Sequence, residues 1–587
     1  MSKPIIFSDK PENDFNEMKL EEGNIAITPL DTQEISYEKV SKWNRFKSSF
    51  KTAEFSEDEY ETLTPLERAA RATANSPLQR SLKARHLQMI AIGGAIGTGL
   101  FIGSGKALAT GGPASLLIAY ALIGAMLYCT VQALGELSVA FPVSGAFSTF
   151  STRFIDPAWG FAMGWNYALL WLSVFPLELV AASLTVQYWN KDINAAAWVS
   201  IFYFFILAVN LFGVKGYGEA EFIFSLIKVL AVIGFVILGI ILNCGGGPTG
   251  GYIGGLYWHD PGSFNHGFKG LCAVFVTGAF SFTGTELVGL AAAETANPRK
   301  TLPSAIKQVF WRITLFYMVS LTIVGLLVPY NDPNLMGASS VDITASPFVI
   351  AIKRAAIPAL PSIINAVILI AVLSVANSAV YGCSRTVAAL SAQGYAPKIL
   401  GYIDRTGRPL GGLALSAFIG LLCFVSASDV ETKVFAWLMA LTGLSSIFTW
   451  GSVCLCHIRF RAALYKKGRS TKELAFKSQV GVWGSWFGFI FNCLVLIAQF
   501  WTGLFPLGGS GADVTNFFQS YLCAPIVIVC YIFWKVWKRP SYISLEDMDI
   551  DTGRREVDLV ALTEELEQER AELAARSIWY RTYKFWC

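Results

Sequence analysis

The sequence predicts an all-α protein that crosses a membrane many times. Of its 587 residues, 53% are hydrophobic and only 15% are charged, whereas soluble domains carry about 25% charged residues. Apolar runs such as "IKVLAVIGFVILGIILN" follow one another along the chain, and about 20 apolar residues suffice for a helix to cross a bilayer. The net charge of +4 is too small to indicate nucleic-acid binding.

Twelve segments are apolar enough to be membrane-spanning helices. The positively charged residues of the connecting loops gather mainly on the side that also holds the N-terminus. The positive-inside rule therefore predicts that both termini are cytoplasmic, which requires an even number of spans. The predicted spans are 87–109, 115–140, 160–188, 196–213, 222–243, 270–292, 309–329, 360–390, 409–428, 434–458, 484–506 and 518–537.

The two ends of the chain are polar. Residues 1–86 carry alternating charges and little apolar periodicity, so we expect a disordered cytoplasmic N-tail. Residues 538–587 form a predicted cytoplasmic C-tail, in which "VDLVALTEELEQERAELAARS" spaces its leucines as an amphipathic helix does. Such a helix would lie on the membrane or pack under the bundle.

Nothing in the sequence indicates an enzyme, a metal site or a cofactor. The eleven cysteines fall mostly inside apolar segments, where a cysteine serves as a small core side chain. They form no CxxC pair and no Cys/His cluster. No Ser/His/Asp or Cys/His arrangement occurs in a context suited to hydrolysis or phosphoryl transfer.

The first and sixth spans are both interrupted. "GGAIGTGLFIGSG" begins at Gly93 and holds six glycines, each costing a helix about 1 kcal/mol relative to alanine. Small and polar residues interrupt the sixth span between Gly278 and Thr285. These two spans each open a set of five, and because five is odd the second set is inverted. We therefore expect two inverted repeats, 87–243 and 270–460, followed by two further helices within 484–537.

Glycines in membrane helices can also serve close helix packing alone. The second interruption, at the symmetry-related place, favours a binding site where the broken helices meet at mid-membrane. Backbone that leaves the helix inside a bilayer is tolerated only where protein or a water-filled cavity satisfies its polar groups.

Charged residues inside the spans are candidates for function because a charge at mid-membrane costs a few kcal/mol or more. Glu178 lies near the middle of span three, Lys228 lies in span five and Glu286 directly follows the break in span six. Desolvation favours the neutral form of such groups, which would suit proton coupling; Lys228 could alternatively snorkel to the inner surface. We expect Glu136 to be a structural anchor and Glu294, beside "NPRK", to be an exposed loop charge.

Several long motifs resemble the fungal amino-acid permeases of the amino acid–polyamine–organocation superfamily. They include "RHLQMIAIGGAIGTGLFIGSG", "LGELSVAFPVSGAF", "NLFGVKGYGEAEFIFSLIKV", "FSFTGTELVGLAAAET" and "SRTVAALSAQGYAPK". The resemblance covers residues 80–587 and is closest to the general amino-acid permeases. It implies a LeuT-like bundle in the plasma membrane, which imports L-amino acids with protons by alternating access.

The resemblance also implies how the substrate is held. The amides of Gly97, Thr98 and Gly99 would bind its carboxylate, which agrees with the affinity of a half-helix N-terminus for anions. Phe280 falls where related bacterial exchangers have an aromatic gate. The implied partners of the α-ammonium are carbonyl groups near Ala95, Phe280 and Thr283.

Lys228 matches the span-five lysine that replaces a sodium ion in proton-coupled relatives, and with Glu286 it is the predicted proton-coupling element. Basic-amino-acid permeases of the family typically have "FQGTELVG" where this chain has "FTGTELVG", which weakens a strictly cationic preference. The candidates for shaping the side-chain pocket are Ser281, Thr283, Glu178 and Asn377.

Three residues of the tails are implied sites of modification. Family members are downregulated by ubiquitin, for which Lys10 and Lys19 are candidate acceptors, so ubiquitin-ligase machinery is an expected partner. Cys587 suits reversible palmitoylation. Two alternatives to a broad-range symporter remain open: a permease restricted to basic amino acids or polyamines, and a sensor that binds amino acids without transporting them.

Overall fold

The computed structural model describes most of the chain after its N-terminal tail. The described residues are 48–51, 82, 84–94, 96–190, 192–248, 250–291, 294–295, 298–336, 346–427, 431–509, 511–554, 568, 571–572 and 575–580. Outside them lie Lys10, Lys19, Ala95, Cys587 and most of the predicted C-tail amphipathic helix. By its internal contacts the chain divides into Met1–Lys47 and Ser48–Cys587, and the helices below belong to the second unit.

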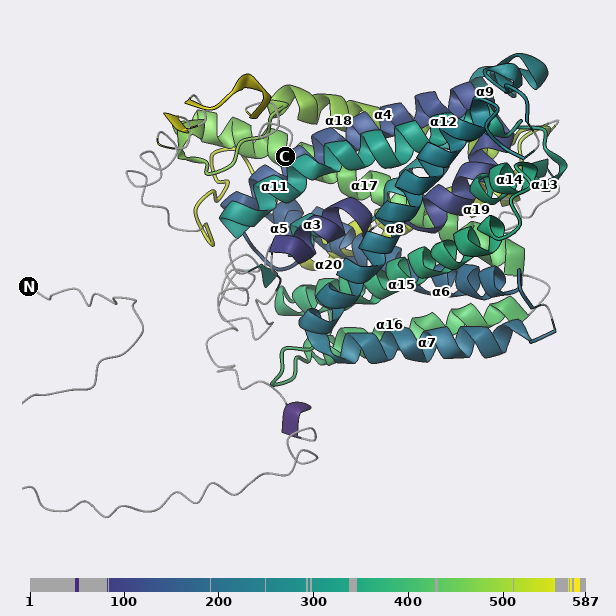
Figure 1. The fold of residues 1–587 in the computed structure, drawn as a ribbon. Helices are drawn as coiled ribbons and strands as arrows, with labels where there is room; N and C mark the ends of the chain where they lie inside the picture. Colours follow the sequence, from purple (N-terminus) through teal and green to yellow (C-terminus); the bar gives the residue numbers. More distant parts are fainter. Residues whose placement is uncertain are drawn as a thin grey trace, which may run out of the picture. The chain divides into compact units, whose positions relative to one another are not determined.

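The predicted all-α membrane fold is confirmed. Long helices run side by side through the unit (Figure 1), and the described residues pair as β-structure only at two isolated bridges. The first predicted span is divided as expected. A half-helix α3 (Ala84–Gly93) ends before the glycine-rich break, and a π-helical turn η2 (Gly99–Gly103) then leads into α4 (Ser104–Ala140).

The helix α4 contains the end of predicted span one and the whole of predicted span two. These two parts are separated by a kink at Gly112, whose φ of 80° is left-handed and suits glycine, and Pro113 follows it. The helix α6 begins on the N-cap Asp156, whose carboxylate accepts a hydrogen bond from the Ala158 amide, with Pro157 at its first position. The remaining helices of the first half are α5 (Ala146–Phe154), α6 (Pro157–Val186), α7 (Ala195–Leu211) and α8 (Gly213–Asn243).

The sixth span is broken as well. It consists of α9 (Gly267–Phe282) and the short α10 (Leu287–Ala291), and the segment between them passes through Gly284, with a φ of 95°. This positive φ explains why glycine stands there. The other helices of the second half are η3 (Trp258–Gly262), α11 (Pro298–Trp311), η5 (Arg312–Val319), α12 (Ser320–Leu327), α13 (Pro333–Met336), α14 (Pro347–Arg354), α15 (Leu360–Ala392), η7 (Lys398–Gly401), α16 (Leu410–Gly420), η8 (Leu421–Ala427), α17 (Glu431–Lys466) and η9 (Thr471–Glu473).

The last helices are α18 (Gly481–Leu504), α19 (Val514–Tyr521) and α20 (Cys523–Lys538). The span predicted over 518–537 is bent, because α19 and α20 meet at an angle of 64°. Pro525 has no N–H to donate to the carbonyl of Tyr521, four residues earlier, so a continuous helix cannot pass this point unbroken.

Each predicted span has a helical counterpart, although twelve crossings remain a prediction. Among the described residues, eight helices are long and apolar enough to cross a bilayer, or nine if α19 and α20 form one bent span. The helices α7 and α16 are apolar but shorter, and α4 contains the end of span one as well as span two.

The start of the C-tail packs against the rest of the unit without forming a helix. The backbone N–H of Ile543 donates to the carbonyl of Ile155, and Met548 and Ile550 are buried. Two ion pairs, Arg469–Asp551 and Arg554–Glu473, have N–O distances of 2.5 and 2.8 Å. This segment precedes the predicted amphipathic helix.

Candidate functional site

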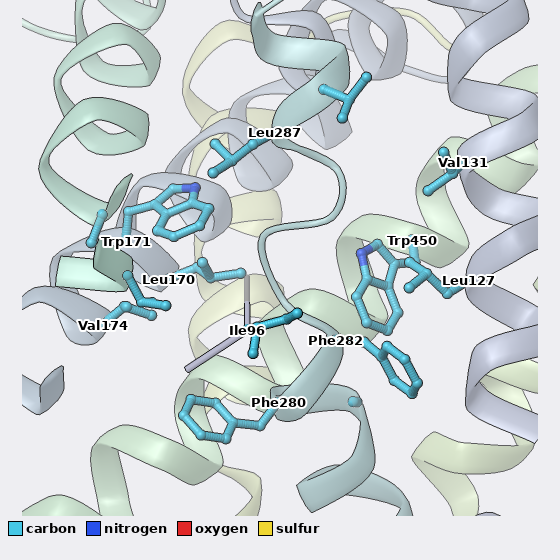
Figure 2. Close-up of a cluster of buried hydrophobic side chains, with 14 of the residues drawn as sticks. Ile96, Leu127, Val131, Leu170, Trp171, Val174, Phe280, Phe282, Leu287 and Trp450 are labelled. Atoms are coloured by element: carbon cyan, nitrogen blue, oxygen red, sulfur yellow. The ribbon is translucent and has the colours of Figure 1, made fainter. Parts of the chain in front are cut away.

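The two broken spans touch each other at their breaks. The Ser281 hydroxyl donates to the carbonyl of Gly99 over 2.8 Å. A Cβ added at Gly99 would lie 2.4 Å from the Cα of Ser281, so the two backbones are in direct contact. Figure 2 shows Ile96 of the first break near Phe280, and the non-helical segment between Phe282 and Leu287 running between Trp171 and Trp450 in the view.

The first break places free backbone amides beside a buried carboxylate. The half-helix that starts at Gly99 leaves its first N–H groups without intrahelical acceptors, and they lie at the positive end of its dipole. The Thr98 hydroxyl donates to Glu178 Oε2 on α6, and both side chains are buried. The arrangement combines an anion-binding helix end with a carboxylate acceptor.

Close packing also requires the glycines of this break. A Cβ at Gly97 would lie 2.5 Å from Val375 Cγ2 on α15, and one at Gly93 would lie 2.5 Å from Ser225 Cβ on α8. A Cβ at Gly103, in contrast, would make an ordinary contact of 3.5 Å with Thr277. Both sequence-based explanations, close packing and an opened helix, therefore hold in the same short segment.

Ser281 is fixed from three sides. Its hydroxyl lies 2.7 Å from the hydroxyl of Tyr120 on α4, and its carbonyl accepts a 2.6 Å hydrogen bond from Tyr317 on η5. Thr283, two residues on, pairs its hydroxyl with that of Ser446 on α17 at 2.7 Å. These bonds hold the end of α9 against α4, η5 and α17, which fixes the position of the second break.

Glu286 shapes the second break. Its two carboxylate oxygens accept hydrogen bonds from the Gly284 amide at 3.2 and 3.1 Å, and Oε2 also accepts from Trp450 Nε1 at 3.3 Å. The side chain is buried. The carboxylate therefore closes a small turn at the point where the helix opens, in addition to any part in proton transfer.

Lys228 is fully buried in α8 and does not snorkel to the surface. Its ammonium donates to the Ser374 hydroxyl over 2.8 Å and lies 3.5 Å from Glu221 Oε1. Ser374 in turn donates to both oxygens of Glu221, at 2.8 and 2.7 Å, and Ser225 donates to Oε1 at 3.2 Å. Because Gly93 packs on Ser225, this ion pair lies next to the first broken helix.

A family model described as "Amino acid permease" matches residues 86–542. The chain belongs to the amino acid permease family. It is 59% identical over 570 residues to the general amino-acid permease GAP2 of Candida albicans, covering 96% of this chain and 97% of that protein. It is 58% identical over 555 residues to the general amino-acid permease GAP1 of Saccharomyces cerevisiae, covering 93% and 92% of the two chains.

More distant similarities complete the comparison. The histidine permease of Saccharomyces cerevisiae is 55% identical over 521 residues, which is 87% of this chain and 86% of that protein. The crystal structure of a manganese transporter of Eremococcus coleocola has a TM-score of 0.47 and 12% identity, over 83% of this chain and 97% of that one. Family membership and the apolar helices make the permease a multi-pass membrane transporter of amino acids and not an enzyme.

Most of the predicted site residues of the permease gather around the breaks. Gly97, Thr98, Gly99, Ser281, Thr283, Phe280, Glu178 and Glu286 come from the breaks themselves or contact them, as the bonds above show. Asn377 differs, because its Oδ1 accepts a 2.9 Å hydrogen bond from Asn210 on α7. Its place in the side-chain pocket stays a prediction.

Sequence reasoning missed Glu221 and Arg312 and misplaced Glu294. Glu221 lies two helical turns before Lys228, but the apolar window began only after it. Glu294 was expected to be an exposed loop charge, which is wrong: it is buried and bonded to Arg385 Nε at 3.0 Å and to the Tyr381 hydroxyl at 3.0 Å. Arg312, within the predicted span 309–329, was not singled out from the sequence; it is fully buried and donates to the carbonyl of Ala91 near the end of α3.

Glu136 has the anchoring contacts expected of it. Its carboxylate accepts two hydrogen bonds from Arg461 at 2.6 and 2.7 Å, lies 3.0 Å from His457 Nε2 and accepts the Ser478 amide at 2.8 Å. The residue thereby joins α4, α17 and the segment that leads into α18. A buried carboxylate with this many charged and polar donors stabilises the packing of the segments that it joins.

Proposed function

We propose that the permease imports a broad range of L-amino acids with protons, by alternating access, across the plasma membrane with both termini cytoplasmic. The observation that carries the proposal is the contact between the two breaks, with a buried Lys228–Glu221 pair beside the first of them. The breadth of range is supported by two relatives, each more than half identical to this chain, that are named general amino-acid permeases.

The α-carboxylate of the substrate binds the free amides at Gly97, Thr98 and Gly99. A half-helix N-terminus stabilises an anion without needing a charged side chain, and such a site accepts any amino acid. The α-ammonium binds the carbonyl groups released where α9 ends, near Phe280 and Thr283. Because these contacts involve only the groups that all amino acids share, the site is compatible with many side chains.

The proton is carried at Lys228 Nζ. When protonated, the ammonium forms an ion pair with Glu221 and donates a hydrogen bond to Ser374. When Lys228 loses its proton, the ion pair that fixes this part of α8 is lost. The ion pair contacts the first half-helix through Ser225 and Gly93, so a change in its charge alters the packing of α3 against α8. Proton binding and movement of the half-helix are coupled in this way.

Radiolabelled uptake tests the proposal in a cell that lacks its own amino-acid permeases. The panel contains neutral, acidic and basic amino acids and a polyamine. Broad uptake that collapses when the proton gradient is dissipated supports a general symporter. Uptake confined to basic amino acids or polyamines would replace it with the narrower permease, and binding without accumulation would point to a sensor.

A control variant separates coupling from folding. Lys228→Met keeps the length and apolar stem of the side chain and removes the exchangeable proton. The Glu221 carboxylate that is left without its partner can take up a proton and become neutral. The variant should therefore reach the cell surface and lose gradient-driven accumulation. Unchanged proton-dependent uptake by this variant would remove Lys228 from the mechanism.

Ubiquitination of Lys10 and Lys19 and palmitoylation of Cys587 remain predictions. Both modifications can be tested in the same permease-deficient cell.

A further inference from the structure

A pocket with a volume of about 270 Å³ lies close to the breaks but is lined by other residues. The start of α4 and parts of α9, α17, α18 and α19 enclose it, and Figure 1 labels α9 and α19 toward the same end of the bundle. Thr277 lines the pocket, and its carbonyl accepts a 2.9 Å hydrogen bond from the Ser281 hydroxyl. The pocket is therefore one helical turn from the contact between the breaks, on the outer side in the predicted topology.

The charge of this pocket is entirely positive. Lys106 lines it with an exposed side chain, and within the described residues its ammonium has neither a hydrogen-bond acceptor nor a carboxylate partner. Lys269 stands at the rim, where its ammonium donates to the carbonyl of the lining residue Pro506 over 3.2 Å. No aspartate or glutamate is among the described residues that line the pocket. A cleft lined by one sign of charge concentrates ligands of the opposite charge.

Two carboxamides in the wall are oriented as acceptors. Gln499 uses its Nε2 atom to donate to the carbonyl of Ser520 at 3.3 Å, and Asn516 uses its Nδ2 atom to donate to the carbonyl of Gly503 at 2.7 Å. Their carboxamide oxygens are left as acceptors that can meet a positively charged donor. The pocket thus combines a free ammonium group with acceptor oxygens, the complement of a zwitterion.

We propose that this pocket is an outer holding site for amino acids, in which Lys106 binds a substrate carboxylate before the substrate reaches the breaks. The inference rests on the proposed function. The pocket volume of about 270 Å³ is slightly below the range of about 300–1,000 Å³ typical of small-molecule pockets, which suits a ligand as small as an amino acid. Acidic amino acids bind with either carboxylate, whereas the positive wall repels the side chains of basic ones.

Kinetics of the Lys106→Gln variant test this charge. The ratio of the glutamate KM to the arginine KM should rise by about threefold to tenfold, because both substrates lose a carboxylate contact but only arginine is also freed from repulsion of its side chain, and Vmax should stay unchanged for both. Lys106→Arg keeps the charge and should keep the wild-type ratio of the two KM values. Lys353→Gln, which removes an exposed lysine of α14 that is not part of the pocket, should change neither KM.

Chemical restoration of the charge gives a second test. In Lys106→Cys, a methanethiosulfonate reagent that adds an ammonium should return the glutamate KM toward the wild-type value, and one that adds a sulfonate should raise it further. The wild-type chain receives the same reagents as a control for Cys244, an exposed native cysteine. If Lys106 variants fail to reach the surface, Lys269→Gln at the rim should show the same signs with smaller changes.

A ratio of the glutamate KM to the arginine KM that stays at the wild-type value, or falls, in both Lys106→Gln and Lys269→Gln would overturn the holding site. Such results would leave the uptake of neutral amino acids intact. Absence of leucine uptake by the wild-type chain would instead contradict the proposed function. The two failures are therefore distinguishable.

Discussion

Gly99→Ala should inactivate the permease although it adds only one methyl group. The new Cβ would lie 2.4 Å from the Cα of Ser281, whereas ordinary contacts begin at 3.4 Å. The first broken helix must therefore move away from the sixth by about 1 Å, because the obstacle is backbone and cannot rotate aside. A displacement of about 1 Å at a site that depends on positioning can cost about a hundredfold in rate.

The assay is initial-rate uptake of a radiolabelled neutral amino acid, normalised to the amount of fluorescently tagged protein at the cell surface. Gly103→Ala is the matched control in the same segment, since its Cβ would make only a 3.5 Å contact with Thr277. We expect uptake to fall at least tenfold in Gly99→Ala, which allows for partial relaxation of the two helices around the new methyl group. Uptake by Gly103→Ala should stay within about twofold of the wild type. Wild-type uptake by Gly99→Ala would refute the contact between the breaks.

Three further outcomes follow from the buried charges. Glu221→Gln should lower the thermal unfolding midpoint of the purified protein, because it leaves the Lys228 ammonium without its carboxylate partner, a change that typically costs about 3–5 kcal/mol. Adding Lys228→Met to Glu221→Gln should recover part of that stability while transport stays lost; no recovery would mean that the pair is not coupled. Glu294→Gln should destabilise the fold by a similar amount through Arg385, and a midpoint equal to the wild type would show that this pair contributes nothing.

The sequence was sufficient to predict the features that depend on local composition. Glycines and polar residues inside apolar runs marked both breaks, because they oppose a helix wherever they occur in such a run. Lys228 and Glu178 were recognised because a charge stands out against an apolar background. The all-α membrane fold followed from the same contrast between apolar runs and polar connections.

Features that depend on partners distant in the sequence were not predictable. Glu221 lies at the edge of an apolar window, and only the structure places Ser374 of α15 between it and Lys228. Glu294 has polar neighbours in the sequence, which suggested exposure, but it is buried in an ion pair with Arg385 of α15. A hydropathy window weighs each residue by itself, so it cannot detect charges that neutralise each other across the bundle.

Purified permease in proteoliposomes provides the most direct test of coupled transport. Amino-acid accumulation and proton entry are measured together, the first with a radiolabelled substrate and the second with a pH-sensitive dye trapped inside, under an imposed inside-alkaline gradient. We predict that each depends on the other in the wild type and that Lys228→Met shows neither. Accumulation without proton entry, or coupled entry that survives in Lys228→Met, would contradict proton coupling through the buried lysine.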